Sequence, residues 1–232
     1  MIYWGVFVLN SKVKKPAMAA LVFCLLSIVF VFTLKNVDVA PVGAYGSIVG
    51  LSSINRFFYN LFGLNMFWYK LTNYPGIALD VFIAFIFTAI GLRQWIKRKS
   101  VLKVDKSLFV LGVTYAVSLV LYILFEKFAI NYRPVILPNE KVFEPSFPSS
   151  HTMFAVIVMG TAIIECTRLI KNIRIKKVVN GLLYSIALIT ILGRMVSGVH
   201  WFTDILGGII IGSAVLAIHC LVVNLINTRK QK

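Results

Sequence analysis

Six long apolar stretches constrain the fold of this chain more than any other feature. They run over about Met18–Leu34, Pro75–Ile96, Ser107–Phe125, Thr152–Leu169, Val178–Val196 and Ile205–Ile226. An α-helix needs about 20 apolar residues to cross about 30 Å of hydrocarbon, and each stretch approaches that length. The stretches are continuous and do not alternate between apolar and polar residues, which argues against the strands of a membrane barrel. The sequence therefore predicts an all-α polytopic membrane protein with six transmembrane helices.

The composition supports this prediction. Hydrophobic residues make up 59% of the 232 residues and charged residues only 14%, so a soluble domain could not bury the apolar surface. The three cysteines, Cys24, Cys166 and Cys220, all lie inside apolar stretches, which favours packing over a disulfide framework. No internal repeat or low-complexity tract divides the chain, and we expect one domain over residues 1–232.

The distribution of basic residues predicts the orientation in the membrane. The formal net charge is +16, with 24 Lys and Arg residues in all. Seventeen of them belong to the N-terminal tail, the 97–106 connection with its span end, the 168–177 connection and the C-terminal tail. The other side of the membrane holds the remaining seven, which are Lys35, Arg56, Lys70, Lys127, Arg133, Lys141 and Arg194. Because cytoplasmic loops are enriched in Lys and Arg, both termini are expected in the cytoplasm, and the charge needs no nucleic-acid partner.

Aromatic residues suggest contacts with the membrane interface. The segment Ser53–Leu71 is rich in aromatic residues but too interrupted by polar ones to span, so we expect it to lie on the outer membrane surface. A loop that packs between helices is the alternative. Trp95 and Trp201 fall at expected span ends, where indole rings favour the interface.

Several polar residues are expected to gather at the outer side. His151 stands where the polar stretch "PSFPSSH" meets the fourth apolar stretch, and Arg194 lies at the outer end of the fifth. His200 and Asp204 flank the short turn into the sixth stretch, and Arg133 follows the third. An arginine inside a membrane helix costs about 2.5–3.5 kcal/mol on insertion scales, so this gathering favours a functional site over packing.

The residue types point to a phosphate group as the ligand. A carboxylate four residues from His200 can orient one ring nitrogen and make the other more basic. A guanidinium group can donate two parallel hydrogen bonds to two phosphate oxygens. Free backbone N–H groups of Ser149, Ser150 and His151 at a helix start would add further donors. Pro148 suits a first helical turn.

The same pattern bears on cofactors. The sequence contains no Gly-rich nucleotide-binding loop, and its outer acidic residues have no recognised metal-ligand spacing. We therefore expect phosphoryl transfer through a histidine nucleophile, with no metal ion and no cofactor.

Three blocks resemble a known family. The segments "EKFAINYRP", "PSSH" and "GRMVSGVHWFTD" are similar to the three signatures of the type 2 phosphatidic acid phosphatase superfamily, which usually read Lys-x6-Arg-Pro, Pro-Ser-Gly-His and Ser-Arg-x5-His-x3-Asp. The match runs over about Lys127–Asp204 in the same order. Three departures stand out: Lys127 is one residue too close to Arg133, Ser150 replaces the usual glycine, and Gly193 replaces the usual serine.

The resemblance implies a mechanism. His200 attacks phosphorus to form a phosphohistidine, Asp204 orients it, and His151 protonates the departing oxygen and then activates water. Phosphate oxygens are held by Lys127, Arg133, Ser149, Ser150 and Arg194.

The family further implies a lipid phosphate monoester or diphosphate as substrate, namely undecaprenyl diphosphate, phosphatidylglycerophosphate or phosphatidate, hydrolysed at the extracytoplasmic face. A phosphotransferase with a lipid acceptor stays open as an alternative, and so does a non-catalytic anion transporter. The expected partners are the lipid substrate and the bilayer, and the oligomeric state cannot be inferred.

Overall fold

The computed structural model describes residues 11–137 and 144–229. These residues form seven α-helices and two short 3-10 turns, η1 (Ala44–Gly46) and η2 (Val101–Lys103). The helices are α1 (Ser11–Asn36), α2 (Ser52–Phe62), α3 (Met66–Arg98), α4 (Lys106–Lys127), α5 (Ser150–Leu169), α6 (Ile173–Val196) and α7 (Phe202–Arg229).

All six expected spans are confirmed as helices. Within the described residues, the six helices other than α2 are long and apolar enough to cross a membrane. Each extends beyond its apolar stretch, because polar residues at a helix end can continue the backbone hydrogen bonds outside the hydrocarbon. The protein is an all-α, multi-pass membrane protein.

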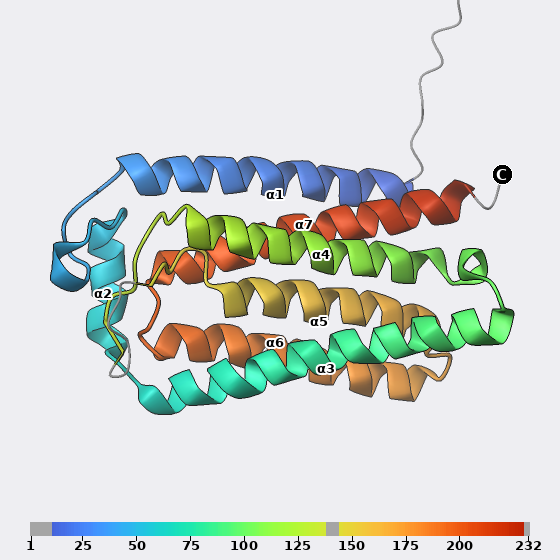
Figure 1. Ribbon diagram of the computed structural model, residues 1–232. Coiled ribbons are helices and arrows are strands. Elements are labelled where there is room, and N and C mark those ends of the chain that lie inside the picture. Colours follow the sequence, from blue (N-terminus) through green and yellow to red (C-terminus); the bar gives the residue numbers. More distant parts are fainter. Residues whose placement is uncertain (1–10, 138–143, 230–232) are drawn as a thin grey trace, which may run out of the picture.

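The six long helices form one bundle that is capped at one end (Figure 1). The connection 37–51 and α2 lie across that end, which we call the α2 end. Both ends of the described chain, at residues 11 and 229, lie at the opposite end (Figure 1). The α2 end therefore collects the connections α4–α5 and α6–α7, which carry the family-like motifs.

Helix α5 lies at the centre of the bundle, where α6 and α7 pack against it. Half of its span is buried, more than in any other described span. Gly208 of α7 permits the close approach, since a Cβ there would come within 2.9 Å of both the Ser149 carbonyl oxygen and the Thr152 Cβ. Small residues at such contacts let two membrane helices pack tightly, and this packing fixes the start of α5 against the start of α7.

The segment Ser53–Leu71, which is expected at the interface, does not form one element. Residues 52–62 form the separate helix α2, but Met66–Leu71 are the first turns of α3. The second span also begins earlier than expected, because Pro75 lies inside α3 and not at its start. Proline is tolerated inside membrane helices, where neighbouring groups compensate for the lost backbone donor.

The orientation of the termini stays a prediction. The two described chain ends share one end of the bundle, which an even number of spans requires. The orientation also relied on Lys141, Lys230 and Lys232, which lie outside the described residues.

Candidate active site

The site is built where two connections pair at the α2 end. The segment after α4 and the segment before α5 run side by side, with the Ser146 amide donating to the Asn131 carbonyl at 2.9 Å and the Arg133 amide donating to the Glu144 carbonyl at 3.1 Å. The indole N–H of Trp201 donates to the Tyr132 carbonyl at 2.8 Å and joins this pair to the α6–α7 connection. These bonds bring motifs that are far apart in the sequence into one place.

His200 lies in the α6–α7 connection, and its side chain is almost fully buried. Its Nδ1 is 3.1 Å from the Ser146 carbonyl oxygen, which can only accept a hydrogen bond. Its Nε2 is 2.8 Å from Nη2 of Arg194, which can only donate. These partners assign the proton to Nδ1 and leave the Nε2 lone pair facing the arginine.

Asp204, in the first turn of α7, supports His200 less directly than the four-residue spacing suggests. Its Oδ2 is 3.7 Å from His200 Nδ1, beyond normal hydrogen-bond length. Oδ2 accepts the Trp201 amide at 2.9 Å, and Oδ1 accepts the Asn131 side-chain amide at 3.2 Å. The two residues do not share a helical turn, since α7 begins after His200. The imidazole is oriented first by the Ser146 carbonyl, with the carboxylate nearby.

Arg194 is fully buried at the end of α6. Its guanidinium lies 5.4 Å from the centroid of the Tyr69 ring, and its Nη2 is taken by His200. Its Nε and Nη1 make no hydrogen bond within the described part of the chain. A buried cation with unused donors is costly unless an anion joins it, so the structure holds a ready position for a negatively charged group.

Arg133 also acts on this site. Its Nη2 forms a 2.6 Å ion pair with Glu144. Its positive charge is close enough to His200 to disfavour protonation of the imidazole. Burial lowers the pKa of His200 well below 6.5, and the charges of Arg194 and Arg133 act in the same direction. The imidazole is therefore neutral at physiological pH, and its unprotonated Nε2 keeps the lone pair that a nucleophile needs.

His151, in the first turn of α5, lies close enough to His200 that a charge on one ring would disfavour a charge on the other. The backbone of Asn73 on α3 approaches the His151 ring, but outside hydrogen-bonding geometry. Both ring nitrogens are buried and lack a hydrogen-bond partner among the described residues. The ring is thus available to exchange a proton with a bound molecule.

His151 and Ser150 also line a cavity of about 400 Å³ between α3, α4 and α5, which we call the active-site cavity. Its other walls are mainly apolar, and Ile77, Val81 and Leu119 among them are exposed on the bundle surface. The cavity therefore reaches the surface that lipid would cover.

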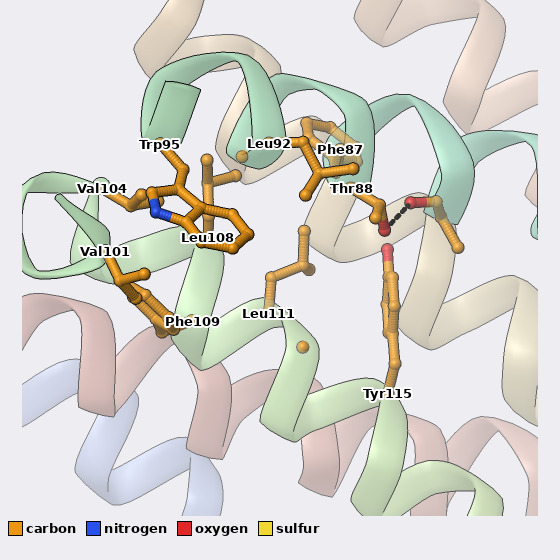
Figure 2. A pocket seen from close by; sticks show the side chains of 13 residues that line it. Phe87, Thr88, Leu92, Trp95, Val101, Val104, Leu108, Phe109, Leu111 and Tyr115 are labelled. Carbon is orange, nitrogen blue, oxygen red and sulfur yellow. Dashed lines mark hydrogen bonds between the residues drawn. The ribbon is translucent and has the colours of Figure 1, made fainter. Parts of the chain in front are cut away.

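A second cavity of about 350 Å³ continues the space between α3 and α4 toward the opposite end of the bundle. It shares Ala84 and Tyr115 with the active-site cavity. Figure 2 shows its apolar walls, with Trp95 and Val101 at one side and Tyr115 at the other. An apolar space therefore follows the α3–α4 boundary away from His151.

The prediction of free backbone N–H donors at the start of α5 is partly wrong. Helix α5 begins at Ser150, and Pro148 precedes it after a cis peptide bond, so Pro148 is not in the first turn. The Ser149 amide donates to the Asp204 carbonyl at 3.0 Å and is not free for an anion. The Ser149 hydroxyl accepts a bond from Thr152 at 3.1 Å. Ser150 and His151 occupy the first turn, where amides have no partner within the helix.

Lys127 is not joined to the cluster by any contact in the described part of the chain. It is the last residue of α4 and is exposed, with Nζ 5.7 Å from the centroid of the Phe128 ring. Its predicted role at the phosphate stays a prediction.

Gly193 has a packing explanation. A Cβ at this position would come within 2.5 Å of Thr72 and 2.9 Å of Trp68, both on α3. The family that the motifs resemble usually has serine here. This chain requires glycine, because side chains of α3 fill the space that a Cβ would take.

Three supporting residues were not found from the sequence. Asn131, Ser146 and Trp201 hold Asp204 and His200, yet they bear no recognisable spacing to the motifs. Trp201 is also not an interfacial indole, since it is only 2% exposed. The described residues contain no group of three or more His, Cys, Asp or Glu that could hold a metal ion.

Comparisons with known proteins find a solved structure of the same fold and a matching family profile. The chain shares its fold with the crystal structure of a transmembrane PAP2 type phosphatidylglycerolphosphate phosphatase from Bacillus subtilis, at a TM-score of 0.60 and 19% identity over 94% of this chain and 98% of that chain. None of the curated proteins matches the chain. The profile of the PAP2 superfamily matches residues 107–229, which is more than half of the chain and includes Arg133, His151, Arg194, His200 and Asp204. The protein therefore belongs to the PAP2 superfamily, as a multi-pass membrane lipid phosphate phosphatase.

Proposed function

We propose that the chain hydrolyses a lipid phosphate monoester or diphosphate at the extracytoplasmic face, through a phosphohistidine on His200. The observation that carries this proposal is the pair Arg194 and His200. A buried guanidinium with two unused nitrogens lies 2.8 Å from the imidazole nitrogen that has the lone pair. A phosphate held by this arginine would place phosphorus next to the nucleophile.

In the first step, Nε2 of His200 attacks phosphorus and a P–N bond forms. The bond breaks between phosphorus and the leaving oxygen, which is the ester oxygen of a monoester or the bridging oxygen of a diphosphate, and the protonated ring of His151 gives that oxygen a proton. The hydrogen bond that Nη2 of Arg194 donates moves from Nε2 of His200 to a phosphate oxygen. Arg133 adds further positive charge near the phosphate. The positive charge that develops on the His200 ring is stabilised by the Ser146 carbonyl at 3.1 Å and the Asp204 carboxylate at 3.7 Å.

In the second step, His151 takes a proton from water, and the oxygen attacks phosphorus. The P–N bond breaks, its electron pair returns to Nε2, and inorganic phosphate leaves. The hydroxyl of Ser149, the first turn of α5 at Ser150 and the ammonium group of Lys127 complete the proposed contacts to phosphate.

The active-site cavity supports a lipid substrate. It joins His151 to the lipid-facing surface through apolar walls, so the hydrocarbon chain of a substrate could stay in the membrane during the reaction. Phosphatidate, phosphatidylglycerophosphate and undecaprenyl diphosphate all fit this description.

The direct test is phosphate release by the purified protein in parallel assays on these three lipids and on a soluble phosphate ester. We expect release from at least one lipid, in the presence of a metal chelator, at a kcat/KM well above that for the soluble ester. A preference for the soluble ester would contradict the lipid assignment. Phosphate uptake by liposomes containing the protein, without hydrolysis, would instead support the transporter.

A further inference from the structure

Asp80 is a polar residue in the active-site cavity that the proposed mechanism does not use. It lies on α3, and the cavity that it helps to line also contains His151 and Ser150. Its Oδ1 is buried and has no hydrogen-bond partner among the described residues. The hydroxyls of two other polar residues in this cavity are engaged, since Tyr115 bonds Thr161 at 3.2 Å and Ser118 donates to the Thr114 carbonyl at 2.7 Å.

A carboxyl group in this place needs a partner. Charged side chains inside a membrane are costly, and those without a cation nearby are more stable as the neutral acid. A neutral carboxyl group has one O–H donor and one further acceptor. An unmet donor in an apolar cavity costs about 1–3 kcal/mol, so a substrate that supplies an acceptor there is favoured over one that does not.

The depth of Asp80 indicates which part of a lipid it meets. Asn73 of α3 lies beside His151, and Asp80 follows seven residues later on the same helix, about 10 Å farther from the α2 end at 1.5 Å per residue. Helical side chains tilt toward the N-terminus of their helix, which for α3 is the α2 end, so the carboxyl group reaches back toward His151. It therefore lies on the hydrocarbon side of His151 in the same cavity, where the part of a lipid next to its phosphate would lie.

We propose that Asp80 is a specificity-determining residue that donates a hydrogen bond to an ester carbonyl of a diacylglycerol phosphate. This inference rests on the proposed function and narrows its substrate class to acyl glycerophospholipids. A polyprenyl chain has only hydrocarbon at this depth and would leave the Asp80 donor unmet.

The test compares three lipid phosphates that differ at this depth. They are a diacyl phosphatidate, its dialkyl ether analogue with the same chain lengths and no carbonyl, and farnesyl phosphate. Wild-type protein is expected to favour the ester lipid over the ether lipid by about fivefold in kcat/KM, the size of one hydrogen bond.

Two variants locate this preference. Asp80→Leu removes the donor and should lower kcat/KM for the ester lipid about fivefold, while kcat/KM for the ether lipid and for farnesyl phosphate changes less than twofold. Asp80→Asn keeps an N–H donor and should retain part of the preference. Thr88→Val is the matched control, because the Thr88 residue lines the second cavity and, among the residues that the structure describes, its hydroxyl bonds only the Ala84 carbonyl of its own helix, at 2.8 Å.

The outcomes are distinguishable. An equal loss on all three lipids in Asp80→Leu would show a purely structural role and overturn the inference, as would an unchanged ester preference. Phosphate release by the wild type without any ester preference would overturn the inference alone. Absence of release from every lipid by folded wild-type protein would overturn the proposed function together with it.

Discussion

The imidazole of His200 shows how the surroundings of a single residue set its chemistry. The Ser146 carbonyl fixes the proton on Nδ1, and the Arg194 guanidinium occupies Nε2. Burial and two nearby guanidinium groups lower its pKa well below 6.5. A ring with this tautomer and charge is a nucleophile without any further proton transfer.

Nitrogen NMR can detect this protonation state directly. The chain has only three histidines, so labelling histidine with nitrogen-15 gives few signals, and His200→Gln assigns one set. Because protonation of the buried ring is disfavoured, we expect His200 to show one protonated and one bare nitrogen from about pH 8 down to about pH 5.5. A His200 signal that titrates near 6.5, as an exposed histidine does, would contradict the structure.

At the residue scale, the sequence predicted the reacting residues better than the residues that position them. His151, Arg194, His200 and Asp204 stand out because charged and ionisable groups are rare in membrane helices. Asn131 and Ser146 do not, since their importance arises only when two connections pair side by side. The hydrogen bond of the Ser149 amide could likewise not be predicted from the sequence, because its acceptor is a backbone carbonyl.

At the scale of elements, the α6–α7 connection is held by its neighbours. Gly198 has a φ of +67°, and a Cβ there would lie 1.8 Å from the Gly63 carbonyl oxygen in the α2–α3 connection. The Asn65 amide donates to the Ser197 carbonyl at 3.0 Å across the same contact. This close approach fixes the turn that carries His200.

Gly198→Ala should therefore displace the catalytic turn. We expect at least a tenfold loss of kcat and a destabilisation of about 1–3 kcal/mol, from the positive φ and the backbone clash. Gly181→Ala is the matched control, because a Cβ on that helical glycine meets nothing within 4 Å. The control should keep its activity and gain up to about 1 kcal/mol of stability. Thermal unfolding in detergent together with kcat tests both variants, and equal behaviour would contradict the proposed role of the turn.

The six helices could be predicted because their length and continuous hydrophobicity leave few alternatives in a bilayer. Their ends could not, since Pro75 suggested a start that α3 passes through. The separation of α2 from α3 was also missed, because the aromatic composition is similar on both sides of the Gly63 turn.

At the scale of the whole molecule, the bundle has two chemically different ends. Both described chain ends lie away from the site (Figure 1), and most basic residues belong to connections on their side. The positive-inside tendency then predicts cytoplasmic termini and an extracytoplasmic active site.

Labelling of introduced cysteines tests this orientation. In a variant without Cys24, Cys166 and Cys220, we expect Ile48→Cys in the connection before α2 to react with a membrane-impermeant maleimide on intact cells. Leu102→Cys, in the connection between α3 and α4, should react only after the cells are opened. Both positions are well exposed, at 64% and 90%, so access across the membrane decides the result. The reverse pattern would place the site in the cytoplasm.

The central claim is that His200 carries the phosphoryl group, and trapping that intermediate tests it most directly. A phosphatidate labelled with phosphorus-32 is mixed with purified protein and the reaction is stopped with base, in which phosphohistidine is stable. We predict labelled protein in the wild type, no label above background in His200→Gln, and normal label in His219→Gln, whose ring lies away from the site between α4 and α7. Label that persists in His200→Gln, or near-normal phosphate release by that variant, would contradict the account.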